Sequence, residues 1–256
     1  MRVVGRIDLT KLAQELRSSG RHDALVKAVD RAAAAGSIRE DLRTALDSLR
    51  QILVIQNGAP ASEIDVSLHA ETVLTGALFT QAVVLYARAT KTEGDRPRLL
   101  GETKLNTKQR LIHDEAMNLR NNVVAHFGRG DTFLDGPLVK EAVVLSLYLD
   151  GDRRKKRIGA YTTRAAHKVA FAARLAELVQ VRLGEIANRY QRLFDTADFE
   201  LEAAVASDPD LGRSLPRFAF DADTFCASRE AADHLRAQLD ADVAQDLDYA
   251  VRVPKP

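Results

Sequence analysis

The chain has 256 residues, of which 46% are hydrophobic and 29% are charged, and its formal net charge is +1. This composition is ordinary for a soluble globular protein, and the length allows one substantial core with room for an extension. Cys226 is the single cysteine, which excludes an internal disulfide and favours a reducing, cytoplasmic setting. The most apolar stretch, 73–87, is shorter than the roughly 20 residues that span a bilayer. We therefore expect a buried helix there, and no membrane partner.

Several enzyme classes lack support because their short motifs are missing from the sequence. It contains no His-Glu-x-x-His pair, no paired cysteines, no phosphate-binding loop and no glycine-rich dinucleotide fingerprint. Zinc hydrolases, nucleotide triphosphatases and dehydrogenases are therefore disfavoured, and we expect neither a metal nor a cofactor.

The near-neutral net charge conceals an uneven distribution along the chain. Lys and Arg outnumber the acids over 96–129, an unbroken basic run occupies 153–157, and acids dominate 221–248. The central part of the chain is therefore locally basic, whereas the C-terminal part is acidic.

Helical periodicity dominates the first half of the chain. Apolar residues at helical spacing predict short helices over 9–16 and 23–35, the second ended by Gly36. Ser37 and Glu40 match a capping box, which predicts that a new helix begins there. Long helices are then expected over 62–90 and 107–126, and the first of these is apolar on most sides in its second half, so we expect it to be central.

The second half begins with the one convincing β pattern. Residues 139–149 and 158–163 are rich in β-forming side chains, and the turn-forming and basic residues between them predict a β-hairpin over about 139–163. We expect a helix from there to about Phe194, with a break near Gly184, and another helix from there to Ala206. An extended connection over 208–225 and a final helix over 229–247 complete the chain.

These elements predict a mainly α protein with a single hairpin insertion. The expected division is an N-terminal helical extension (1–36), a helical domain that contains the hairpin (37–206) and an acidic C-terminal extension (207–256).

The stretch 119–128 carries the most distinctive pattern in the chain. It contains Arg120, a polar Asn121 beside it, and His126 six positions after the arginine. This pattern resembles the Arg-polar-x4-His motif of the HEPN superfamily, and the segment 80–89 is similar to the upstream helix of such domains. The resemblance implies a HEPN-like helical bundle, a metal-independent endoribonuclease activity and a homodimer that binds RNA, and the β-hairpin predicted above is then an insertion after the motif helix.

The chemistry of these residues fits RNA cleavage by the ribose 2′-hydroxyl. A histidine has an ordinary pKa of about 6.5 and suits a general acid or base, as His126 would be, whereas Arg120 is always charged and suits a phosphate. In a continuous α-helix, six residues separate the two by about 9 Å along the axis and about 120° around it. We therefore expect a composite site to which two copies contribute. Asn121 is part of this catalytic motif, and Asn122, four residues before His126, is placed to orient the imidazole.

The same residues fit a second class of function. A histidine at a helix end interacts favourably with the helix dipole, and an arginine beside an apolar stripe often extends to solvent. In that case their role is purely structural and the motif is fortuitous. The alternative to an enzyme is a non-catalytic HEPN-like dimer that binds RNA or a protein, and a third class is a structural helical domain. A catalytic protein is expected to be a toxin or an antiviral defence effector, with an antitoxin or regulatory protein as a further partner.

Two other groups of residues have weaker patterns. The basic run either follows an RNA backbone or is simply solvated. His113, seven residues before Arg120, is expected to be an exposed helical histidine. The candidate RNA-binding residues of the basic run are Arg153, Arg154, Lys155, Lys156 and Arg157.

Overall fold

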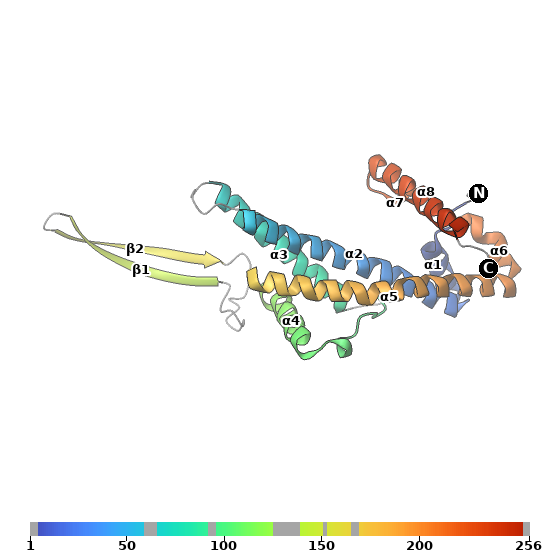
Figure 1. The fold of residues 1–256 in the computed structure, drawn as a ribbon, viewed down its shortest axis with the longest axis horizontal. Coiled ribbons are helices and arrows are strands. Elements are labelled where there is room, and N and C mark those ends of the chain that lie inside the picture. The colour runs from blue at the N-terminus through green and yellow to red at the C-terminus, as the bar shows by residue number, and fades with distance from the viewer. Residues whose placement is uncertain are drawn as a thin grey trace. The chain divides into compact units, whose positions relative to one another are not determined.

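The computed structural model describes residues 5–58, 66–91, 96–124, 139–150, 153–164 and 169–252. The protein is mainly α-helical with one two-stranded antiparallel hairpin, as the sequence predicts (Figure 1). Its internal contacts divide it into two units. The larger comprises Lys27–Phe199, and the smaller joins Met1–Val26 to Glu200–Pro256. The two ends of the chain thus belong to one unit, whereas the sequence pattern suggested two separate extensions.

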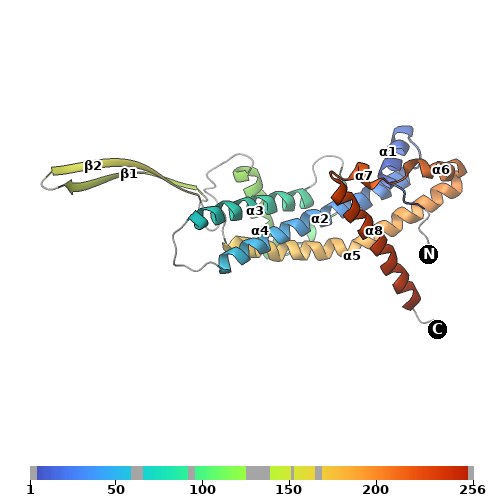
Figure 2. The ribbon, with the colours of Figure 1, turned by 90° about the horizontal axis from the view of Figure 1, so that it is seen from above.

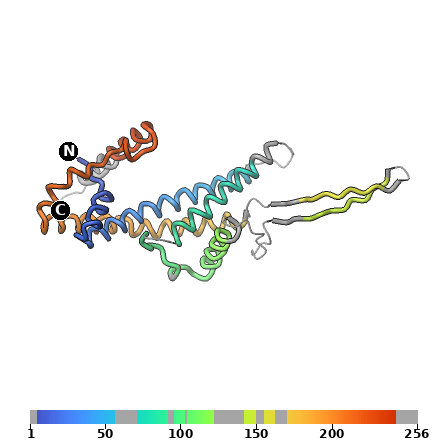
Figure 3. The backbone as a smooth tube through the Cα atoms, turned by 180° about the vertical axis from the view of Figure 1, so that it is seen from behind, coloured from blue at the N-terminus to red at the C-terminus, as the bar shows by residue number. Residues whose placement is uncertain are grey.

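The larger unit is built on three long helices, α2 (Asp23–Gly58), α3 (Val66–Thr90) and α5 (Val169–Ser207). They lie side by side in three different views (Figures 1, 2 and 3). The short 3-10 helix η1 (Glu102–Lys104), the helix α4 (Thr107–Asn118) and the π-helix η2 (Leu119–Val124) follow α3. Both α4 and η2 contact α3.

One hydrophobic core connects these helices. Each helix presents buried side chains at intervals of three or four residues, which places them on one face. The fully or nearly fully buried members include Ala35, Ile38, Leu42 and Leu49 of α2, Phe79, Val83 and Tyr86 of α3, Ile112 and Ala116 of α4, and Phe171, Leu175, Leu178 and Ile186 of α5.

The predicted helix breaks at Gly36 and Gly184, and the predicted boundary near Phe194, are wrong. α2 runs without interruption through Gly36, and α5 runs through Gly184. The predicted capping box at Ser37 is therefore absent, because Ser37 lies inside α2. A glycine within a helix costs about 1 kcal/mol relative to alanine, and burial of neighbouring side chains such as Ile38 offsets more than this.

Helix α3 is the most apolar helix of the described chain. Its segment Glu71–Thr90 is long and apolar enough to cross a membrane by length and composition alone. In the structure, Phe79, Ala82, Val83 and Tyr86 of this segment are buried in the core. These buried positions agree with the prediction of a helix central to the fold.

The hairpin consists of β1 (Val139–Asp150) and β2 (Arg153–Arg164). Its register pairs Leu145 with Ile158 and Asp150 with Arg153. The basic run was expected in the turn, but the structure places it at the start of β2. The reason is that each basic residue has a cross-strand partner in this register, so pairing extends farther toward the turn than the apolar pattern indicated.

The smaller unit contains α1 (Leu9–Ser19), α6 (Pro209–Ser214), the 3-10 helix η3 (Leu215–Phe218), α7 (Ala222–Phe225) and α8 (Arg229–Arg252). The expected extended connection over 208–225 is thus mostly helical. Asp208 and Asp221 each accept backbone hydrogen bonds as N-caps and so allow these short helices to form. Asp8 donates its backbone N–H to the Phe218 carbonyl at 2.7 Å, which ties the N-terminal segment to η3.

Candidate functional site

The motif helix begins with a complete capping box and changes its winding before it reaches the motif. The Asn106 side chain accepts from the Gln109 N–H at 2.9 Å, and the Gln109 side chain accepts from the Asn106 N–H at 3.1 Å. α4 then continues to Asn118, where the π-helix η2 takes over. A π segment is rare and often marks a functional site.

Arg120 and Asn121 lie within this π segment, and both are half-buried. Arg120 Nη1 donates to Asn121 Oδ1 at 2.9 Å. The preceding residue, Leu119, is buried in the core, which anchors the segment. The polar residue beside the arginine therefore restrains the guanidinium, and a charge-assisted contact of this kind limits its rotamers.

The structure describes the remaining motif residues only in part. Asn122 belongs to η2 by its backbone, but its side chain lies outside the described residues, as does the whole of His126. The expected separation of Arg120 and His126, about 9 Å along the helix axis and about 120° around it, assumed an α-helix throughout. It does not apply over 119–124, because π winding adds a residue to the turn. The composite arrangement of Arg120 and His126 thus stays a prediction.

A buried polar cluster near α4 was not anticipated from the sequence. His113 was expected to be exposed, but it is 4% exposed and packs against Tyr86, which is fully buried. Tyr86 Oη lies 2.8 Å from His113 Nδ1, and the two rings meet edge to face. The prediction failed because His113 follows Ile112 on the buried side of α4, a position that the spacing to Ala116 could have revealed.

Burial determines the protonation of this cluster. Desolvation lowers the His113 pKa from its usual value, with Glu102 opposing and Arg182 reinforcing the shift. Desolvation also raises the Tyr86 pKa above its usual range, against the opposing effect of Arg182. A neutral histidine with its proton on Nε2, toward Glu102 at 4.0 Å, accepts a hydrogen bond at Nδ1 from the Tyr86 hydroxyl.

Arg182 joins this cluster from α5 and is itself fully buried. Its Nη1 donates to the Gly101 carbonyl at 3.0 Å and to Glu185 Oε2 at 2.9 Å. Its Nε has no hydrogen-bond partner among the described residues. Together with the Tyr86–His113 hydrogen bond and the electrostatic effect of Arg182 on both groups, these contacts connect α3, α4, α5 and the segment before η1. The cluster therefore positions α4, which leads into the segment that carries Arg120.

Several cations of the basic region 96–129 are used within the fold. Arg98 binds Glu102 at 2.8 Å, and Arg110 donates to the Glu102 carbonyl at 3.1 Å. Arg96 donates at 3.3 Å to Asp41, which is 3% exposed and also binds Arg88. The basic character of the motif region is thus smaller in the structure than in the sequence, because these side chains already have internal partners.

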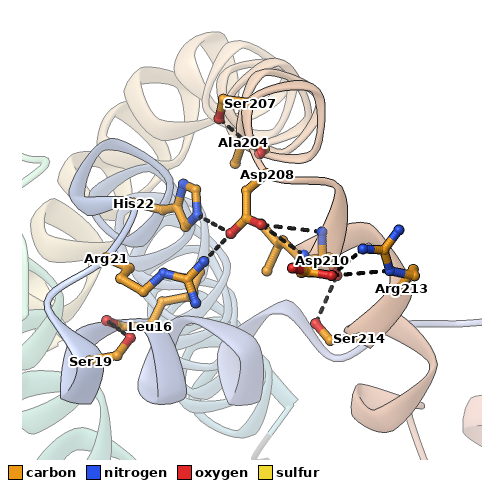
Figure 4. A network of polar contacts seen from close by, with 11 residues as sticks. Leu16, Ser19, Arg21, His22, Ala204, Ser207, Asp208, Asp210, Arg213 and Ser214 are labelled. Carbon is orange, nitrogen blue, oxygen red and sulfur yellow. Dashed lines mark hydrogen bonds and ion pairs between the residues drawn. The ribbon is translucent and has the colours of Figure 1, made fainter.

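A separate polar cluster, in the smaller unit, centres on Asp208 (Figure 4). Its Oδ2 contacts Arg21 and lies 3.2 Å from His22 Nε2, while Oδ1 caps α6. The His22 hydrogen bond contributes most to lowering the Asp208 pKa. His22 adopts a left-handed φ of 50°. Since every carboxylate oxygen is already engaged, the cluster joins the corner before α2 to the corner before α6 and has a structural role.

The basic run lies on the hairpin, apart from the motif in the sequence. Lys155, Lys156 and Arg157 are exposed, whereas the side chains of Arg153 and Arg154 lie outside the described residues. In the part of the chain that the structure describes, no group of three or more His, Cys, Asp or Glu side chains is placed to hold a metal.

Comparison of the chain with protein-family models, curated proteins and solved structures finds no match.

Proposed function

We propose that this protein is a metal-independent endoribonuclease of the HEPN type, acting in the cytoplasm as a toxin or an antiviral defence effector. Arg120 would stabilise charge on the phosphate, and His126 would act as the general acid or base. The observation that carries the proposal is the Arg-polar-x4-His pattern, whose arginine and polar residue occupy a π-helical segment and hydrogen-bond to each other.

The fold supports this proposal at a general level. A HEPN domain is a helical bundle, and the larger unit is a bundle of long helices with α4 and η2 packed against α3. The half-buried position of Arg120 also favours a role in a confined site over simple solvation. We propose that two copies pool their arginines and histidines, with RNA as substrate and an antitoxin or regulatory protein as a further partner.

Cleavage of RNA in EDTA tests the proposal. We expect the parent to cut RNA, and His126→Ala and Arg120→Ala to lose about 10²–10⁴ in rate, as is usual when a general acid or base is removed. Arg120→Lys keeps the charge but not the bidentate geometry, so it should remain impaired. Lys108→Ala is the matched control, because Lys108 is an exposed cation on α4, outside the motif.

Three outcomes separate the functions. RNA cleavage lost in both motif variants, with unchanged melting curves, supports the enzyme. RNA binding without cleavage selects the non-catalytic helical dimer. Activity that persists at the parental rate in His126→Ala rules out the proposed mechanism. Light scattering of the parent adds an independent check, because a monomer at micromolar concentration contradicts a site composed of two copies.

A further inference from the structure

The register of the hairpin divides its side chains between two faces. Residues directly opposite each other on antiparallel strands point to the same side, and neighbours along a strand alternate. One side, the tyrosine face, comprises Ala142, Val144, Ser146, Tyr148, Lys155, Arg157, Gly159 and Tyr161. The other side, the apolar face, comprises Val143, Leu145, Leu147, Leu149, Lys156, Ile158 and Ala160.

Gly159 gives independent evidence for this assignment. A Cβ atom built on Gly159 would lie 3.0 Å from Cε2 and 3.2 Å from Oη of Tyr161. The Tyr161 ring therefore lies over the glycine, on the tyrosine face, and uses the space that a side chain would fill. Tyr161 is nevertheless 59% exposed and Tyr148 is 49% exposed. Both rings thus present a surface to solvent.

Two cations lie on the tyrosine face, one beside Tyr148 and one between the two rings. Lys155 is directly opposite Tyr148, and Arg157 follows two residues later on the way to Tyr161. Six residues of strand separate Lys155 from Tyr161, which is about 20 Å. Exposed aromatic rings alternating with cations form the usual platform for single-stranded nucleic acid, whose bases stack on rings while its phosphates pair with cations.

We propose that the tyrosine face of the hairpin binds single-stranded RNA, with bases stacked on Tyr148 and Tyr161 and phosphates bound by Lys155 and Arg157. The inference rests on the proposed function for its biological role, since it names single-stranded RNA as the substrate class. Duplex RNA fits this face poorly because its bases are already stacked, and its deep, narrow major groove excludes a two-stranded ribbon.

An anionic membrane is the competing partner, and it would use the opposite face. Leu147 is 75% exposed and Ile158 is 67% exposed on the apolar face, with Lys156 beside them. The observations favour RNA because Tyr148, Tyr161, Lys155 and Arg157 lie together on the face that lacks these large aliphatic side chains. The two partners therefore make opposite predictions for adjacent residues.

Adjacent residues supply matched control variants. The full chain is titrated with a fluorescent single-stranded 2′-O-methyl oligouridine, which cannot be cleaved, and anisotropy gives the Kd. Tyr148→Ala should weaken binding about 5- to 100-fold, and Tyr148→Phe should retain it, because stacking needs the ring and not the hydroxyl. Leu147→Ala, one residue away on the apolar face, should leave the Kd unchanged.

The charges are tested in the same way. Arg157→Ala and Lys156→Ala each remove one positive charge from neighbouring positions, but only Arg157 lies on the tyrosine face. Arg157→Ala should reduce the slope of log Kd against log salt by about 0.7, the value for one phosphate contact on a single strand. Lys156→Ala should leave this slope unchanged. Circular dichroism confirms that each variant keeps its fold.

Failure of this inference is distinguishable from failure of the proposed function. Equal effects of the paired variants, or duplex RNA bound as tightly as single-stranded RNA, would overturn the inference. So would binding to phosphatidylserine vesicles that Leu147→Ala abolishes, with no RNA bound. If the variants show no face-specific binding, RNA cleavage that depends on Arg120 and His126 would still stand as a separate result. Conversely, face-specific binding by a protein that cuts no RNA would support RNA binding by the tyrosine face and refute the proposed ribonuclease activity.

Discussion

Replacing Tyr86 by phenylalanine tests whether the buried cluster holds α3 and α4 together. The change removes the hydroxyl that lies 2.8 Å from His113 Nδ1, while the edge-to-face ring contact persists. Tyr86 is 0% and His113 4% exposed, so the acceptor that remains has no access to solvent. Leaving a buried polar group unsatisfied costs about 1–3 kcal/mol. We therefore expect Tyr86→Phe to lower the free energy of unfolding by about 1–2 kcal/mol.

A double-mutant cycle separates this hydrogen bond from general loss of packing. Urea unfolding is followed by circular dichroism for Tyr86→Phe, His113→Leu and the double variant, with the m-value checked for constancy. If the two groups bind each other, the double variant should be about 1 kcal/mol more stable than the sum of the single effects predicts. Additive effects, or a Tyr86→Phe variant within about 0.5 kcal/mol of the parent, would refute the reasoning.

Two further predictions concern pH and helix continuity. Because burial lowers the His113 pKa, the unfolded chain binds the proton first, so the parent should lose stability as the pH falls below about 6.5 and until it reaches the lower folded pKa. Urea unfolding across this range should show a flatter profile for His113→Leu, and an identical profile contradicts the assignment. Gly36→Ala should stabilise the protein by about 0.5–1 kcal/mol, because Gly36 lies inside α2 and a Cβ there meets nothing within 4 Å. Gly20→Ala is the control and should destabilise it by about 1–2 kcal/mol, since Gly20 has a φ of +65° at the end of α1. Thermal melting that ranks the two variants in the opposite order would contradict the continuous helix.

The sequence predicted the elements whose signals were long and periodic. The helices α1, α3 and α4 followed from their apolar periodicity, and the hairpin followed from its β-rich runs. The signals that failed were single residues. Gly36 and Gly184 predict helix ends, but α2 and α5 continue through them, because the cost of one helical glycine is small compared with the burial of neighbouring apolar residues.

The candidate site was predicted only in part. The sequence placed Asn121 beside Arg120, but neither their hydrogen bond nor the π winding of Leu119–Val124 has a signature in the sequence. The environment of His113 was missed for a related reason. Its partners Tyr86 and Arg182 are distant along the chain, and only tertiary packing brings them together.

The π turn at Leu119–Val124 has a consequence for insertions and deletions in this segment. An α-helix advances about 100° per residue, so deleting one residue here would let α4 continue with ordinary winding while its core face stays in place. The residues after the deletion would then keep their chemistry, and the winding of α4 would set the direction in which their side chains point. A π turn absorbs one residue in this way. Chains that differ by one in the spacing from arginine to histidine can therefore direct the histidine alike, and equal spacing does not guarantee equal geometry.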